Sequence, residues 1–195
     1  VCGFLGCDAR PFNPLLLSLP RVLHIAEATS AEDGWLGLLV EATLRESEER
    51  RIGGGGVLSK LSELIFIETI RRYAERQGDA ARSWLAGLND PLVGRAIRAL
   101  HRDPGRAWTL NDLAREVGSS RTALADRFAE HVGMPPMTYL TNWRMQIAAA
   151  HLADRSQTMA RIAATIGYES EAAFSRAFKR CVGMAPSEWR RATGA

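Results

Sequence analysis

The sequence predicts a mainly α-helical chain that contains a duplicated helical unit near its C-terminus. Apolar residues recur at helical spacing over most of the chain beyond residue 30. Two C-terminal stretches repeat one another, and glycines and prolines separate the periodic segments. Of the 195 residues, 46% are apolar, which suffices for a core and excludes wholesale disorder. No run of 18 apolar residues is present, so we expect no transmembrane helix.

Charge is distributed unevenly along the chain. Residues 1–89 carry 10 basic and 12 acidic side chains, whereas residues 90–195 carry 15 basic and 10 acidic ones, so the net charges are −2 and +5. The basic side chains are 23 arginines and 2 lysines. A basic, arginine-rich C-terminal half indicates an anionic partner, although a mildly basic solvated surface would have a similar composition.

The first 25 residues are predicted to be non-helical. Residues 1–7 are short, apolar and interrupted by glycine, which is typical of a strand, and the prolines and Asn13 within residues 8–14 indicate a turn. A second apolar stretch covers residues 15–25. One or two strands cannot form a stable sheet alone, so we expect another chain, or a larger domain upstream of Val1, to complete it.

Two amphipathic helices are predicted next. Ser30 is a candidate N-cap for a helix over residues 35–51, whose apolar face is formed by Leu36, Leu39, Val40 and Leu44. The four glycines of residues 53–56 are expected to break the chain before a second helix over residues 57–76. The second helix is more apolar than a surface helix needs. We therefore expect residues 31–76 to form a hairpin that dimerises, or one that covers a missing domain.

The boundary between two domains is expected near residue 82. Glycine and aspartate residues punctuate the region around a short segment at residues 80–88. A helix over residues 91–102 follows, with Asp90 as its cap and Pro91 in its first turn. Residues 1–82 and residues 83–195 are therefore treated as separate domains.

The chain from Trp108 onward contains a diverged duplication. Residues 113–118 match residues 162–167, and residues 120–139 then match residues 170–189. The matched pairs include Leu124 with Phe174, Phe128 with Phe178, Gly133 with Gly183 and Pro136 with Pro186. A repeat of this size means that one supersecondary unit is built twice.

Each copy is predicted to form a helix, a tight turn and a second helix. Gly118 and Gly167 end the first helix where a positive φ is needed, and Ser120 and Ser170 cap the second. Apolar residues four apart anchor that second helix to the core. This is the layout of a helix-turn-helix, whose second helix enters the major groove of DNA.

A helix over residues 136–154 is predicted to join the two copies. At 1.5 Å per residue it spans roughly 27 Å. With the flanking turns, this length approaches the ~34 Å of one DNA turn. One chain could therefore place two recognition helices in successive major grooves on the same face of the duplex.

Several stretches then match a known pattern, namely residues 108–114, 136–145, 162–170, 174–179 and 183–190. Together they resemble the AraC/XylS family of bacterial transcription regulators, over about residues 88–192. The resemblance implies an all-α DNA-binding domain with two helix-turn-helix units, promoter regulation at the bacterial nucleoid in the cytoplasm, and RNA polymerase as a further partner. It also suggests that Arg144, on the joining helix, has a structural role rather than a base-reading one.

The N-terminal part of the chain is similar to one branch of that family, though more loosely. Residues 1–25 resemble the last strands and exit loop of a cupin-like sensor domain, and the next two helices resemble the dimerisation helices of that branch. The resemblance implies that most of the β-barrel, with its small-molecule or redox effector, is absent from this chain.

The exposed faces of the two recognition helices supply the candidate DNA contacts. Arginine reads guanine, serine and threonine bond more loosely, carboxylates accept from cytosine, and alanine can rest against a thymine methyl. The first-unit candidates are Ser119, Arg121, Thr122, Ala125 and Asp126. The second-unit candidates are Glu169, Ser170, Glu171, Ala172, Ser175 and Arg176. Arg127, Lys179 and Arg180 are candidate phosphate contacts, with a solvated face as the alternative for each.

Two of these positions carry particular weight. The resemblance matches Arg176 and Lys179 to an arginine and a lysine of the family's second recognition helix. Asp126 occupies the position equivalent to Arg176, where a basic residue is usual in the family. Unless Asp126 reads a cytosine, the first unit should bind DNA more weakly than the second.

No catalytic residue, metal site or cofactor is predicted. Cys2 and Cys7 have no histidine near them in the sequence, so they are interpreted as two buried apolar residues or as a redox-sensing pair. Cys181 is expected to pack in the core. The alternative function is a non-catalytic helical dimerisation or adaptor module, whose behaviour would not depend on DNA or salt.

Overall fold

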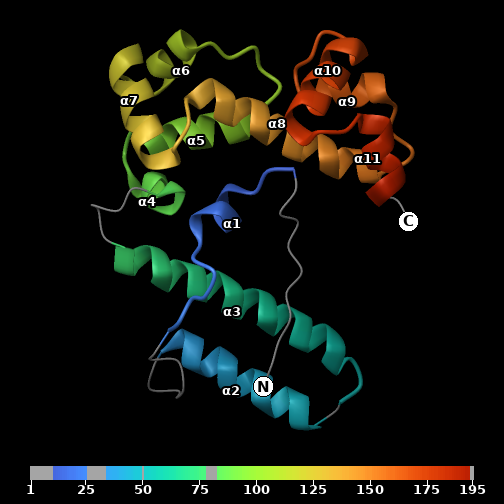
Figure 1. Ribbon diagram of the computed structural model, residues 1–195. Coiled ribbons are helices and arrows are strands. Elements are labelled where there is room, and N and C mark those ends of the chain that lie inside the picture. The colour runs from blue at the N-terminus through green and yellow to red at the C-terminus, as the bar shows by residue number, and fades with distance from the viewer. Residues whose placement is uncertain (1–10, 26–33, 50, 78–82, 194–195) are drawn as a thin grey trace. The chain divides into compact units, whose positions relative to one another are not determined.

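The computed structural model describes residues 11–25, 34–49, 51–77 and 83–193, and it is helical with no strand in those ranges (Figure 1). The described residues form two compact units. One unit holds residues 19–77 as far as they are described, and the other holds residues 11–18 together with residues 83–193. The predicted strand over residues 1–7 and the predicted cap Ser30 lie outside the described residues.

The first unit is a helical hairpin, as predicted. Helix α2 (Trp35–Glu49) packs along helix α3 (Gly54–Gln77). The expected break over all four glycines is wrong, because only Gly53 lies in the turn, with φ +83°, and the other three form the first turn of α3. Glycine permits a turn without preventing a helix, and the apolar run that begins at Val57 extends this helix through its packing on α2.

Helix α1 (Pro14–Ser18) contradicts the prediction that the first 25 residues are non-helical. Asn13 caps this helix, because its Oδ1 accepts a hydrogen bond from the Leu16 N–H at 3.1 Å. Pro14 is in the first helical turn, where its fixed φ fits. The preceding Phe12 is buried in the core of the second unit, edge-on to the Tyr139 ring. This placement was not predicted from the sequence.

The second unit contains eight further helices. They are α4 (Trp84–Asn89), α5 (Val93–Arg102), α6 (Leu110–Glu116), α7 (Arg121–Val132), α8 (Pro136–Ala153), α9 (Met159–Thr165), α10 (Glu171–Val182) and α11 (Pro186–Thr193). Helix α5 begins two residues after Pro91, and Asp90 caps it as predicted, because its Oδ1 accepts from the N–H groups of Leu92 and Val93 at 2.9 and 2.8 Å.

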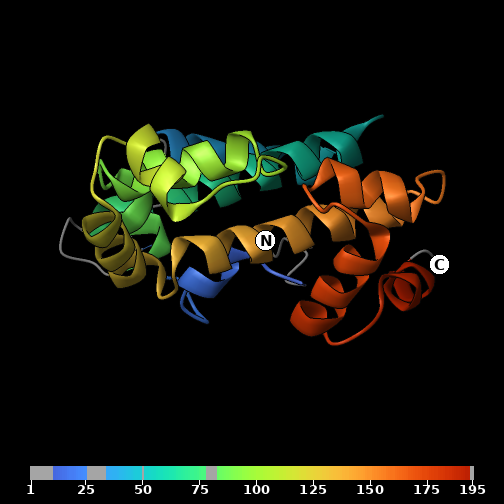
Figure 2. The same cartoon turned by 90° about the horizontal axis from the view of Figure 1, so that it is seen from above.

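Helix α8 runs through both halves of this unit and matches its predicted length closely, with 18 residues (Figure 2). Its N-terminal part contributes Tyr139 and Leu140 to a core shared with α5, α6 and α7. Its C-terminal part contributes Met145, Ala148 and Leu152 to a separate core shared with α9, α10 and α11. Each three-helix group therefore folds on its own segment of one continuous helix.

The predicted duplication is confirmed helix by helix. Helix α9 repeats α6 at an offset of 49 residues, and α10 repeats α7 at an offset of 50, with both members of each pair equal in length. Gly133 and Gly183 end the two second helices with positive φ, and Pro136 and Pro186 begin the helices that follow. The two copies use the same local chemistry at equivalent positions.

Candidate nucleic-acid interface

Each helix-turn-helix is held by side-chain caps and by one glycine in its turn. The Oγ atoms of Ser120 and Ser170 each accept a hydrogen bond, at 3.2 Å, from the N–H three residues further on. Gly118 and Gly167 have φ of +68° and +79°, as predicted. Each serine satisfies one of the free N–H groups at the start of α7 or α10, so both helices begin at a defined residue.

Aromatic and aliphatic side chains fix which face of α7 and α10 points outward. Leu124 and Phe128 on α7, and Phe174 and Phe178 on α10, are completely buried. Phe128 lies edge-on to Tyr139, and Phe178 lies edge-on to Trp189, at centroid distances of 5.6 and 6.0 Å. Because both helices are anchored in the same way, their opposite faces remain exposed.

The candidate contacts lie around these exposed faces. Most of the candidate side chains are exposed, and only Ser119, Ala125 and Ser175 are half-buried. The first-unit residues cluster at the N-terminal half of α7 and the second-unit residues at the N-terminal half of α10. The structure thus brings each set together within its own unit.

The cations of the two recognition helices differ in their partners. Within the described residues, no ion pair or side-chain hydrogen bond engages the Arg176 guanidinium or the Lys179 ammonium group. Arg127, in contrast, donates from Nε to Asp90 Oδ2 at 2.7 Å, and its second nitrogen lies 2.6 Å from the same oxygen. The Asp90 partner raises the pKa of the Arg127 guanidinium. Arg127 therefore ties α7 to the start of α5.

Asp90 is the buried partner in that contact. Burial by itself would raise the pKa of Asp90, but the hydrogen bond from Arg127 and those from the Val93 and Leu92 N–H groups outweigh it, so the pKa lies below its ordinary value. The sequence identified Asp90 as a cap and missed its ion pair. The two residues are 37 positions apart, and no local pattern marks such a contact.

The cysteines fall outside any site of the described chain. Cys181 is exposed on α10, so the expectation that it packs in the core is wrong. It lies three residues after the buried Phe178, on the same side of the helix, but in the last turn of α10, where the core no longer covers it. Cys2 and Cys7 lie outside the described residues. None of the described helices combines the length and the apolar character needed to cross a membrane.

Two capped helix-turn-helix units on one joining helix define a tandem helix-turn-helix DNA-binding fold. A helix-turn-helix domain family matches residues 113–192, and a cupin family matches residues 1–75. Among solved structures, the C-terminal domain of AraT, a response regulator from Geobacillus stearothermophilus, has a TM-score of 0.51 and 29% identity, over 53% of this chain and 86% of that one.

Curated relatives extend the similarity to the N-terminal part. An AraC-like transcription regulator of Streptomyces lividans is 40% identical over 97% of this chain and 62% of its own length. The HTH-type transcriptional regulator AlkR of Acinetobacter baylyi is 33% identical over 94% of this chain and 60% of its own length. The chain thus spans about three fifths of these two relatives. It belongs to the AraC/XylS family of transcriptional regulators.

Proposed function

We propose that this chain is a sequence-specific, DNA-binding transcription regulator that inserts α7 and α10 into successive major grooves at a promoter. The supporting observation is the pair of equally long, serine-capped helices, each anchored by two fully buried side chains and each held on α8. A helix fixed in this way presents a rigid outer face to base edges, which direct readout requires.

Arg176 is the proposed principal base contact of the second helix-turn-helix unit, and Arg121, although not at the equivalent position, is that of the first. Both guanidinium groups are exposed on the outer faces of their helices. An arginine that donates two hydrogen bonds to guanine contributes about 1–3 kcal/mol of discrimination against the wrong base. Lys179 and Arg180 are proposed to bind phosphates, and so is Arg127 where its pairing with Asp90 leaves donors free.

Selection of bound sequences from a random DNA pool tests this function. The selection is then repeated with the Arg176→Ala variant. We expect the parent chain to select a two-part site and the variant to lose preference at one half-site. Arg180→Ala, one turn further along the same helix, should instead weaken binding to all sequences and reduce its salt dependence. An unchanged preference in the Arg176→Ala variant would remove that residue from the interface.

The salt dependence of binding separates this function from that of a helical adaptor. Phosphate contacts release counterions, so the affinity of a DNA-binding regulator falls steeply as salt rises. An adaptor module would show no DNA binding to weaken. Titrations of the selected site at several salt concentrations distinguish the two outcomes.

The α2–α3 hairpin is proposed to act as a homodimerisation element through residues 31–76. Large apolar side chains remain exposed on both helices of the hairpin, including Trp35 (54%), Leu38 (46%), Leu64 (41%) and Ile67 (46%). Large apolar side chains exposed on both helices of one hairpin favour an interaction site. We further propose that residues 1–82 are the sensor-side domain and residues 83–195 the DNA-binding domain. The proposed setting is the bacterial cytoplasm at the nucleoid, with RNA polymerase and a small-molecule or redox effector as further partners.

Sedimentation velocity tests the dimer. We expect the parent chain to sediment as a dimer and the Ile67→Glu variant as a monomer. Ile52→Glu is the matched control, because Ile52 is fully exposed in the turn between α2 and α3. A monomeric parent chain, or equal effects of the two substitutions, would contradict the proposed interface.

A further inference from the structure

The two helix-turn-helix units contact each other at a point where neither backbone has room for a side chain. A Cβ atom placed on Gly167, in the turn of the second unit, would lie 2.2 Å from the carbonyl oxygen of Gly105. A Cβ atom placed on Gly105, in the loop between α5 and α6, would lie 2.8 Å from the Thr165 carbonyl oxygen. Gly105 does not have a positive φ, so close approach rather than backbone conformation accounts for its glycine.

Arg144 reaches the same point from the middle of α8. Its Nε donates to the Pro104 carbonyl at 2.7 Å, and its Nη2 donates to the Arg106 carbonyl at 2.8 Å. Its guanidinium also lies 5.8 Å from the centre of the Tyr168 ring, which follows Gly167 in the second unit. One planar group therefore contacts the loop of the first unit and the turn of the second. The single ammonium group of a lysine could reproduce these contacts only in part.

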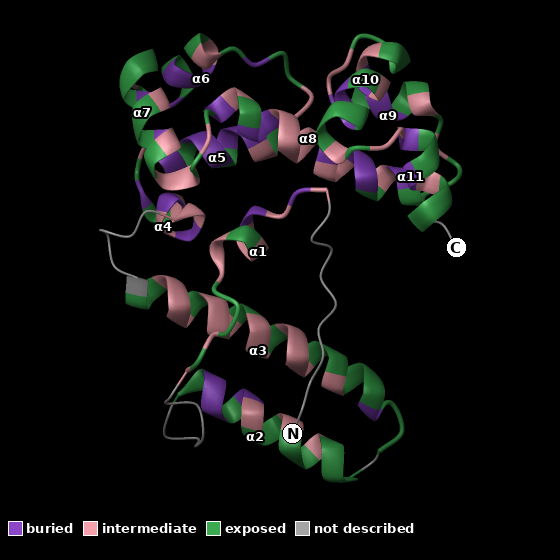
Figure 3. Ribbon diagram, in the orientation of Figure 1, coloured by how far each residue is buried: buried purple, intermediate pink, exposed green. Residues whose placement is uncertain are grey.

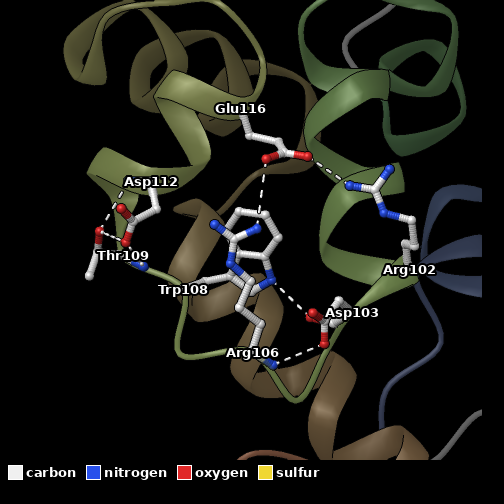
Figure 4. A network of polar contacts seen from close by, with 7 residues as sticks. All are labelled: Arg102, Asp103, Arg106, Trp108, Thr109, Asp112 and Glu116. Atoms are coloured by element: carbon white, nitrogen blue, oxygen red, sulfur yellow. Dashed lines mark hydrogen bonds and ion pairs between the residues drawn. The ribbon is translucent and has the colours of Figure 1, made fainter.

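The loop that receives Arg144 is itself held rigidly (Figure 4). The Trp108 indole donates to the Asp103 carbonyl at 2.8 Å, and the Arg106 N–H donates to the Asp103 carboxylate at 3.2 Å. The Arg106 guanidinium covers the Trp108 ring at 3.8 Å from its centre and approaches Glu116 at 3.7 Å. These contacts restrain the loop that carries the two carbonyls that accept from Arg144.

Helix packing alone leaves the joint between the units dependent on one helix. Helices α6 and α7 pack on α5 and on each other, and α9 and α10 pack on α8 and on each other. Helix α8 is common to both groups, but a single helix can bend or twist. A contact beside its midpoint, formed by residues of both units, would restrict that movement.

We propose that Arg144, Gly105 and Gly167 form a clamp that fixes the orientation of the two recognition helices and so sets the half-site spacing that the chain accepts. The proposal rests on the proposed function of both units in DNA binding. Once the first recognition helix has bound, the second binds intramolecularly, and its effective concentration depends on how narrowly the joint restricts it. Arg144 is a positioning residue in this scheme and contacts no base.

Gly167→Ala and Gly118→Ala provide a matched pair. Both glycines occupy the same position of their motif at positive φ, but a Cβ on Gly118 would have nothing within 4 Å. Both variants therefore incur the backbone strain, and only Gly167→Ala separates the two units. Arg144→Ala and Arg144→Lys test the hydrogen bonds, and Arg98→Ala is their control, because Arg98 is exposed on α5.

Binding is measured on three DNAs derived from the selected site, namely the full site, one isolated half-site, and full sites with one base pair added or removed between halves. We expect Gly167→Ala and Arg144→Ala to weaken full-site binding about tenfold or more, to leave half-site binding within about twofold, and to flatten the spacing preference. Arg144→Lys should lie between these variants and the parent chain, and Gly118→Ala should keep the parent's spacing preference. Equal losses on the full site and the half-site, or an unchanged spacing preference in both clamp variants, would overturn the clamp.

A measurement without DNA separates failure of the clamp from failure of the proposed function. Spin labels are placed at Ala123 on α7 and Ala172 on α10 of the full chain, with its three cysteines changed to serine, and the labelled chain is diluted with unlabelled chain. Pulsed electron paramagnetic resonance measures the distance between the two labels. It should give one narrow distance distribution for the parent and for Gly118→Ala, and broader or shifted distributions for Gly167→Ala and Arg144→Ala. Indistinguishable distributions in all four chains would exclude the clamp, whatever DNA the parent selects.

Discussion

The two helix-turn-helix units have the same backbone plan but different surfaces and supports. Helix α7 carries Arg121 and Arg127 against Asp126 and Glu130, whereas α10 carries Arg176, Lys179 and Arg180 against Glu171. The recognition helices therefore differ by two charges, and one cation of α7 is already paired with Asp90. The first helix-turn-helix unit is packed against more of the chain, because α4, α5 and the buried Phe12 pack around it. Of the two recognition helices, α10 therefore carries the larger positive charge.

Removing an aromatic anchor should produce the largest effect in either unit. Phe128→Ala and Phe178→Ala each delete a completely buried ring and should each lower the free energy of unfolding of their unit by about 3–5 kcal/mol. Urea denaturation followed by circular dichroism measures the loss. The units should respond alike, because their anchors are equivalent. A loss below about 1 kcal/mol in either would contradict this equivalence.

Loss of the Asp90 contact should affect the stability of the two helix-turn-helix units unequally. Asp90→Ala removes the cap of α5 and the partner of Arg127, and it should destabilise the first unit by about 2–3 kcal/mol. Asp154→Ala is the comparison in the second unit, because Asp154 is exposed and bonds only its neighbours Ser156 and Gln157. Urea denaturation should show the smaller loss for Asp154→Ala. Equal losses would mean that burial of Asp90 does not matter.

Acid should selectively destabilise the first unit through His101. This side chain accepts from or donates to the Tyr139 hydroxyl at 2.8 Å and stacks on Trp143, and burial lowers its pKa from 6.5 to about 4. Between those values the unfolded chain binds a proton that the folded chain does not, so stability falls as pH is lowered from about 6.5 to about 4.

The expected loss over that range is about 2 kcal/mol, after allowance for the partial exposure of the ring. Denaturation curves from pH 7.5 to pH 4 measure it. His101→Phe keeps an aromatic ring at the stack and cannot titrate, so its stability should fall less over the same range. Parallel pH profiles for the parent and the variant would exclude His101 as the source.

The smallest expected effect is a gain of affinity in the weaker unit. Asp126→Arg places on α7 the residue type that α10 carries as Arg176, and it should tighten DNA binding about tenfold, or about 1.4 kcal/mol. The slope of log affinity against log salt should steepen by about one unit. Asp126→Ala removes only the negative charge and should give part of the gain. Weaker binding by both variants would show that Asp126 itself reads a base.

Burial also distinguishes the first unit of the chain, the α2–α3 hairpin, from the DNA-binding unit (Figure 3). Leu36 and Leu39 of α2 are buried, but every large apolar side chain of α3 is half-buried or exposed. The many apolar side chains of α3 are therefore not enclosed in a core by the described residues. Periodicity predicted both helices correctly and could not show how much of their apolar surface remained open.

The sequence by itself determined the duplicated helix-turn-helix units, because caps, turn glycines and apolar pairs four apart act within a few residues of one another. Ser120, Gly118 and Phe128 have the roles that their spacing predicted. Only the tertiary structure decided the contacts that join distant segments. It placed Gly105 against Gly167, paired Asp90 with Arg127, and set Phe12 on Tyr139. Such contacts depend on where whole helices meet in space, and no local residue pattern encodes that meeting.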